Sequence, residues 1–177
     1  MMEEPVLFGS RDYFILLVLL LSSRGSDFLS TWIATPNLVL EANPLAKKLG
    51  WKWGIPVNLV LCVGFAFWPL PAIIICTTSV LVAARNFQVA WLMHTAGEEN
   101  YRAWIVERMQ ETTPGLFIFC LLAQTVLTAG VGLLLMYFSH GQLEPLGIGM
   151  GIVAYAAAVT VFTFIALWKN RRAERQE

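Results

Sequence analysis

Residues 13–34 read YFILLVLLLSSRGSDFLSTWIA, an apolar stretch long enough to cross ~30 Å of hydrocarbon as one helix. Glu3 and Glu4 precede it, where a signal peptide would carry basic residues, so we expect it to remain in the mature protein. Two charges, Arg24 and Asp27, lie inside the stretch, and such charges face the interior of a bundle rather than lipid. The stretch therefore predicts the first span of a helical membrane protein.

The rest of the chain repeats this pattern of apolar runs separated by short charged segments. Of its 177 residues, 57% are hydrophobic and 14% are charged, which is far from the usage of a soluble domain. The formal net charge is zero, so no nucleic-acid partner is expected. We predict an all-α fold in one domain, a polytopic transmembrane helical bundle of about five spans. The predicted spans cover residues 13–34, 51–68, 72–94, 116–138 and 146–168, and residues 97–112 are predicted to form an interfacial amphipathic helix.

The distribution of basic residues predicts the orientation, because short loops rich in Lys and Arg stay in the cytoplasm. With the N-terminus outside, Arg11 is the basic residue of the outer side. The inner side then carries Lys47, Lys48, Lys52, Arg102, Arg108, Lys169, Arg171, Arg172 and Arg175. The C-terminus is thus expected in the cytoplasm and the protein in the inner (cytoplasmic) membrane. A four-span alternative would place the lysine cluster and the basic tail on opposite sides, so it is less favoured.

Polar side chains form a stripe on one face of the first span. Ser23, Arg24, Asp27, Ser30 and Thr31 recur at helical spacings. The third span supplies Arg85 and Asn86 at a similar predicted depth, so we expect Asp27 and Arg85 to meet. An ion pair between Arg24 and Asp27, three residues apart on one helix, is the alternative of comparable weight.

The segment between the first two spans is too apolar for an ordinary solvated loop, and it is expected to turn back toward the bundle. Pro44 can begin the next helix with Asn43 as its N-cap. Glu41 lies among apolar neighbours, just below the predicted positions of Asp27 and Arg85. His94 and the pair Glu98 and Glu99 are most simply an interfacial histidine and a solvated helix start. The candidate catalytic residues are Asp27, Glu41 and His94, and the candidate ligand-binding residues are Arg24, Asp27, Thr31, Glu41, Asn43, Arg85 and Asn86.

Small residues gather in the last two spans. Gly130, Gly132, Gly147, Gly149 and Gly151 allow helix backbones to approach closely, so these spans are predicted to form the scaffold. No metal-ligand spacing such as HExxH is present, and the sequence assigns no cofactor.

The pattern of Asp27, Thr31 and then Glu41-Ala42-Asn43-Pro44 resembles a family of small polytopic membrane proteins of bacteria and archaea, of unknown function. That family has Asp-x-x-x-Thr in its first span, followed by a Gly/Glu-x-Asn-Pro connection. The resemblance covers about the first third of the chain and implies a shared helical core without implying an activity. One difference is that the basic residue expected inside the second span is absent, and Asn58 is the strongly polar side chain there.

Three hypotheses about function follow from this polar inventory. The first is a non-enzymatic membrane protein that binds a lipid or small anion in the cytoplasmic half of the bundle, or serves as a subunit of a membrane complex. The second is a membrane-embedded enzyme acting on a lipid headgroup, with Asp27 or Glu41 as acid or base and Arg24 and Arg85 holding a phosphate. The third is a component of a proton or solute pathway. The expected partners are the lipid bilayer and either further copies of the chain or other membrane subunits.

Overall fold

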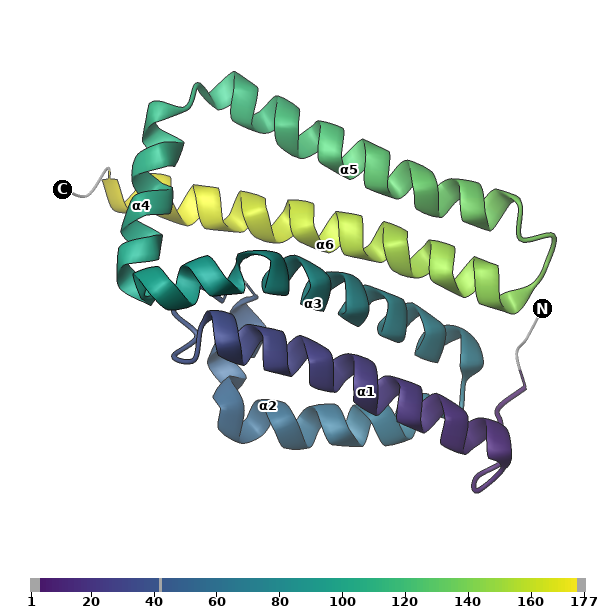
Figure 1. Ribbon diagram of the computed structural model, residues 1–177. Coiled ribbons are helices and arrows are strands. Elements are labelled where there is room, and N and C mark those ends of the chain that lie inside the picture. The colour runs from purple at the N-terminus through teal and green to yellow at the C-terminus, as the bar shows by residue number, and fades with distance from the viewer. Residues whose placement is uncertain (1–3, 42, 175–177) are drawn as a thin grey trace.

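A computed structural model describes residues 4–41 and 43–174, without the side chains of residues 167–174. The basic tail predicted from Lys169, Arg171 and Arg172 therefore has a described backbone only, and Arg175 lies outside the described residues. Within these residues the chain forms helices and no strands (Figure 1). The helices are α1 (Arg11–Ala34), α2 (Pro44–Phe65), α3 (Pro69–Ala96), α4 (Glu98–Glu111), α5 (Pro114–Tyr137) and α6 (Leu143–Glu174).

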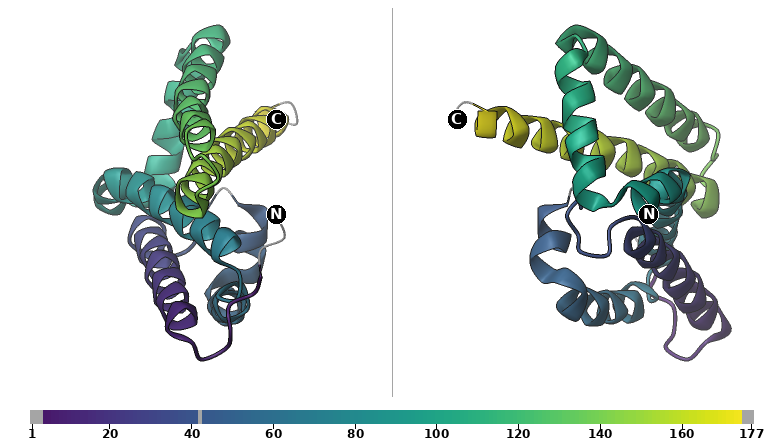
Figure 2. Two further views of the ribbon diagram at one scale, coloured as in Figure 1. Left: turned by 90° about the vertical axis from the view of Figure 1, so that its right-hand side faces the viewer. Right: turned by 60° about the vertical axis from the view of Figure 1, so that its left-hand side comes forward.

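The long helices lie side by side, and their directions follow from the residues that they bring together. Arg24 contacts Ser79 and Thr31 contacts Asn86, so α1 and α3 are parallel. Arg24 also contacts Asn58, while Tyr13 donates to the carbonyl of Val63, so α2 runs antiparallel to α1. Figure 1 shows α6 running with α1 and α3, and α5 running against them. α4 crosses the end where α1 and α3 finish, and we call this the α4 end (Figures 1 and 2).

The helix boundaries follow local signals in the sequence. Asn43 caps α2 as predicted, because its side chain accepts from the backbone N–H of Leu45 at 3.0 Å. Pro69 begins α3 and Pro114 begins α5, at first-turn positions where the missing N–H costs no hydrogen bond. A helix is present where the interfacial amphipathic helix was predicted, because α4 covers Glu98–Glu111 against the predicted residues 97–112.

Glycines allow α6 to pack closely on both α5 and α3, as predicted for most of them. A Cβ atom at Gly132 would lie 2.7 Å from the carbonyl oxygen of Gly149, so α5 and α6 touch backbone to backbone. On the other side of α6, a Cβ atom at Gly151 would lie 2.6 Å from Cβ of Thr77 in α3. Gly130 differs, because a Cβ atom there would meet nothing within 4 Å.

Four of the described helices are long and apolar enough to cross a membrane, namely α1, α3, α5 and residues 143–166 of α6. The five predicted spans also included residues 51–68, which lie largely in α2, and α2 is not among these four helices. Gly50 interrupts it with a φ of 60°, and the regular part, residues 51–65, is about 22 Å long at 1.5 Å per residue. This is shorter than the ~30 Å hydrocarbon layer. α2 nevertheless returns alongside α1, from the level of Phe28 to that of Tyr13.

Candidate functional site

The strongest polar contacts inside the bundle gather around Arg24. Its Nη1 donates to Asp27 Oδ2 at 2.7 Å and to Ser79 Oγ at 3.2 Å. Its Nε donates to Asn58 Oδ1 at 2.9 Å, and Nη2 donates to the same oxygen. We call these four residues the Arg24 cluster. The guanidinium thus binds acceptors on α1, α2 and α3, and it also lies over the ring of Phe28.

The predicted pair between Asp27 and Arg85 is wrong. Asp27 pairs with Arg24, whereas Arg85 is exposed and has no hydrogen bond or ion pair within residues 4–41 and 43–174. The reason is rotational: Ser79 and Asn86 face α1, and Arg85 lies one residue, or 100°, around α3 from Asn86. The alternative prediction, an ion pair between Arg24 and Asp27, is confirmed. This pair depends only on the three-residue spacing within α1 and not on how another helix is rotated.

A second polar contact lies closer to the α4 end. Asn86 donates through Nδ2 to Ser30 Oγ at 3.3 Å and to Thr31 Oγ1 at 3.2 Å. The predicted site residues Thr31 and Asn86 therefore meet. Their contact extends the row of polar contacts between α1 and α3 that begins at Arg24 and Ser79.

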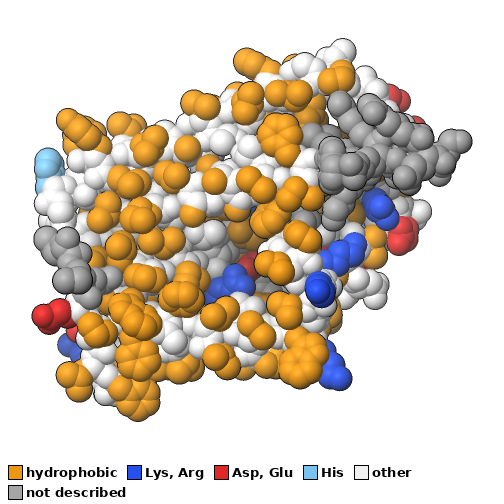
Figure 3. Space-filling model, turned by 180° about the vertical axis from the view of Figure 1, so that it is seen from behind, with side chains coloured by type: hydrophobic (Ala, Val, Ile, Leu, Met, Phe, Trp, Pro, Cys, Tyr) orange, Lys and Arg blue, Asp and Glu red, His pale blue; other side chains and the backbone are white. Residues whose placement is uncertain are grey.

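In Figure 3, seen from behind, a basic and an acidic side chain lie together in the middle of a largely apolar face.

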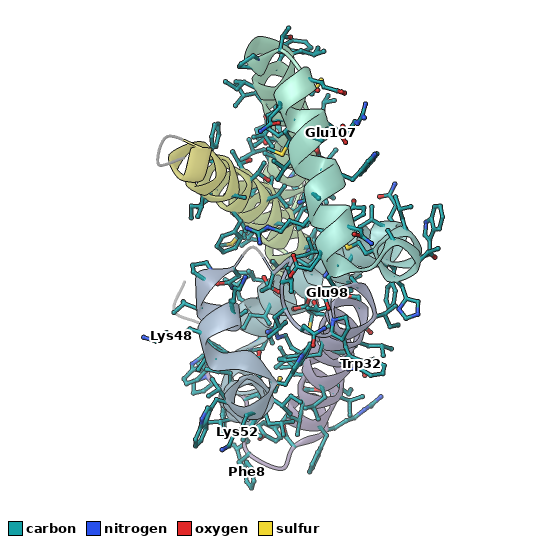
Figure 4. The ribbon with its side chains drawn as sticks, turned by 90° about the vertical axis from the view of Figure 1, so that its left-hand side faces the viewer. Phe8, Trp32, Lys48, Lys52, Glu98 and Glu107 are labelled. Carbon is teal, nitrogen blue, oxygen red and sulfur yellow. The ribbon has the colours of Figure 1, made fainter. Side chains whose placement is uncertain are left out.

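Glu98, at the start of α4, holds the segment between α1 and α2. Its Oε2 accepts from the hydroxyl of Thr35 at 2.5 Å and from the N–H of Val39 at 3.1 Å. Its Oε1 accepts from the backbone N–H and from Nδ2 of Asn37, both at 2.9 Å. Figure 4 shows Glu98 at the centre of the α4 end, whereas Lys48 points outward from α2. The sequence pattern predicts that Glu98 lies at a solvated helix start, and it does not predict this contact.

The sequence did carry a signal for this contact. The segment after α1 is more apolar than a solvated loop, which predicts that it turns back toward the bundle. Thr35 and Asn37 are its polar donors, and Glu98 is the acceptor that binds them. The two groups are about 60 residues apart in sequence, so no local pattern could pair them.

The other candidate residues are dispersed. Glu41 accepts from the N–H of Asn43 at 2.8 Å and lies close enough to Asp27 for their charges to interact. His94 is exposed and, in the described part of the chain, has no hydrogen-bond partner. It lines an open pocket of about 540 Å³ at the α4 end, together with Pro36, Asn37, Val39, Glu98 and Glu99. Asp27, Glu41 and His94 therefore share no hydrogen bond, and among the described residues no three His, Cys, Asp or Glu side chains could hold one metal ion.

No family model, curated protein or solved structure matches the chain.

The contact of Glu98 gives the first prediction. Removal from water raises the pKa of Glu98, but the hydrogen bonds from Thr35, Asn37 and Val39 outweigh this, so its pKa lies below the ordinary 4.5. The stabilisation is thus present above pH 4.5 and is lost as the pH falls through the lower folded value. At neutral pH, Glu98→Ala should speed amide hydrogen exchange in residues 35–40 at least about tenfold, because the N–H groups of Asn37 and Val39 lose their acceptor.

The matched control is Glu99→Ala, which removes a neighbouring carboxylate with no described bond to this segment and should leave exchange unchanged. Equal exchange in both variants would contradict the contact.

Proposed function

We propose that this chain is a five-pass protein of the inner membrane, with the α4 end in the cytoplasm, and that it binds the phosphate of an anionic phospholipid without catalysing a reaction. Parallel packing of α1 and α3 supports five passes, because residues 35–68 must return across the bundle between them. The resemblance of the Asp27 to Pro44 pattern to small polytopic membrane proteins remains a prediction.

The proposed orientation rests on charge. Lys47, Lys48 and Lys52 belong to the first turns of α2 at the α4 end, and Arg102 and Arg108 belong to α4 itself. Arg11, at the start of α1, is at the opposite end. Basic residues favour the cytoplasmic side, so the α4 end is assigned to it.

Cysteine labelling tests this topology in a background without the three native cysteines. Gln142→Cys, exposed in the turn between α5 and α6, should react with a membrane-impermeant maleimide in intact cells. Glu107→Cys, exposed on α4, should react only after the membrane is permeabilised. Labelling of Glu107→Cys in intact cells would reverse the proposed orientation.

The observation that supports an anionic lipid as the ligand is the exposed Arg85, which has no partner among the described residues. A cation inside a spanning helix costs at least ~2.5 kcal/mol unless it finds a partner or reaches the headgroups. Trp91 is 67% exposed and lies six residues farther along α3, about 9 Å closer to the α4 end. From that depth a long arginine side chain can extend to the headgroup layer, where phosphate is the available anion. Arg24 has no such role, since each of its three nitrogens already donates within the bundle.

Lipid retention tests this proposal. The chain purified in mild detergent from a mixture of phosphatidylglycerol and phosphatidylcholine should keep the anionic lipid in native mass spectra, and Arg85→Gln should reduce that retention about tenfold. Arg102→Gln is the control, because it removes an exposed positive charge from α4 and should change retention less than about twofold. Equal retention in both variants would refute the assignment. A stable oligomer that disappears in Arg85→Gln would favour a partner helix with an acid instead.

A further inference from the structure

The donors that surround Glu98 have the arrangement of an anion site. Two backbone N–H groups, one hydroxyl and one amide nitrogen converge on one carboxylate at 2.5–3.1 Å. All four come from residues 35–39, a short segment that contributes no charge of its own. A single carboxylate thus receives four hydrogen bonds from one strip of chain.

The backbone of this strip points the N–H groups of Asn37 and Val39 toward Glu98, while the N–H of Leu38 between them donates to the carbonyl of Thr35 at 2.9 Å. Leu38, between the two donating N–H groups, has a φ of 56°, in the left-handed region that residues with a side chain rarely adopt. Backbone N–H groups that converge at a turn containing a left-handed residue can form a concave nest that binds anions, and here the two N–H groups on either side of Leu38 converge on the carboxylate. Thr35 Oγ1 accepts from the N–H of Leu40 at 3.1 Å, so its own proton is directed at Glu98. Trp51 further fixes the strip by donating to the carbonyl of Pro36 at 2.8 Å.

The carboxylate in this nest can be reached from outside. Pro36, Asn37, Val39 and Glu98 all line the open pocket of about 540 Å³ at the α4 end. Lys47 places a positive charge beside the strip, because its Nζ lies 3.3 Å from the carbonyl oxygen of Val39. An anion in this pocket would therefore compete with Glu98 for the same four donors.

We propose that residues 35–39 form a binding site for a phosphate group, and that Glu98 occupies this site as an internal anion until a phosphate displaces it. A phosphate has the several acceptor oxygens needed to satisfy four convergent donors. These same hydrogen bonds lower the pKa of Glu98, as expected where donors converge on a negative charge. This site is separate from Arg85 and does not rest on the proposed function.

The experiment removes the internal anion. Glu98→Ala should bind inorganic phosphate at least about tenfold more tightly than the wild type, measured by isothermal titration calorimetry in detergent at constant ionic strength. Glu99→Ala leaves the nest filled and should behave as the wild type. Adding Thr35→Val to Glu98→Ala removes one donor and should reverse the gain, whereas adding Arg85→Gln should not.

The source of the phosphate is decided in a second arm. In nanodiscs, preferential retention of phosphatidic acid over phosphatidylcholine by Glu98→Ala identifies a lipid headgroup, and binding of inorganic phosphate alone identifies a free phosphate. A folded Glu98→Ala protein that gains affinity for neither ligand overturns the proposal. If Glu98→Ala does not fold, Glu98→Ser replaces it, because serine is too short to reach the nest. A gain of affinity for either ligand in Glu98→Ser then supports the proposal, and no gain for either ligand overturns it.

Discussion

Arg24→Met should lower the free energy of unfolding by about 2 kcal/mol or more, less than the roughly 3–5 kcal/mol for one partner of a fully buried ion pair, because the Arg24 side chain is 28% exposed. The substitution keeps the apolar stem and deletes the donors that join α1 to α2 and α3. Asp27, whose side chain is 16% exposed, is then left without its positive partner. Asn58 and Ser79 lose the same donor. Reversible unfolding in mixed micelles, followed by circular dichroism, measures the change.

Arg85→Met is the matched control for this loss, because Arg85 is also an arginine of a spanning helix but is exposed and unpaired among the described residues. It should change the unfolding free energy by less than about 0.5 kcal/mol. Adding Asp27→Asn to Arg24→Met should recover part of the loss, since it removes the unpaired carboxylate. Similar losses for the two arginine variants would mean that Arg24 is not the centre of the bundle's polar contacts.

Gly132→Leu should separate α5 from α6 and lower the free energy of unfolding by about 3 kcal/mol or more. Even a methyl group there would lie 2.7 Å from a backbone oxygen of α6, which no side-chain rotation can relieve. The hydroxyls of Thr125 and Thr160 lie 2.6 Å apart across the same pair of helices. Replacing both by cysteine therefore provides a second measurement, because disulfide formation between them should fall when Gly132 is enlarged.

Gly130→Leu tests whether the effect belongs to the contact or to the loss of a glycine. It lies two residues earlier on the same helix, where added atoms meet open space, and leucine is the better helix former. We expect a change of less than about 1 kcal/mol and normal cross-linking. A loss equal to that of Gly132→Leu would show that α5 and α6 do not pack as described.

Features set by neighbouring residues were predictable from the sequence. The cap at Asn43, the helix starts at Pro44 and Pro114, and the length of the apolar runs depend on contacts within a few residues. Close packing by Gly132 was predicted from the small residues of the last two spans, although the same reasoning does not distinguish it from Gly130, which meets no neighbour.

The rotation of α3 about its own axis was not predictable. The helix is apolar around most of its circumference, so no periodicity shows whether Arg85 or Asn86 faces α1. One residue of difference turned the expected partner of Asp27 outward. Glu98 was missed for another reason, since its donors come from a segment whose shape depends on a left-handed residue, Leu38.

The shortness of α2 has a consequence for how the protein enters the membrane. During synthesis, α1 reaches the translocon first, with Arg24 lacking the acceptor that Asn58 later supplies from 34 residues farther along the chain. In the proposed five-pass arrangement, the regular part of α2 is shorter than the hydrocarbon layer, so its insertion would depend on pairing with α1. On the five-pass proposal we therefore expect α1 to be retained at the lateral gate until α2 emerges from the ribosome, so that the two segments leave it together.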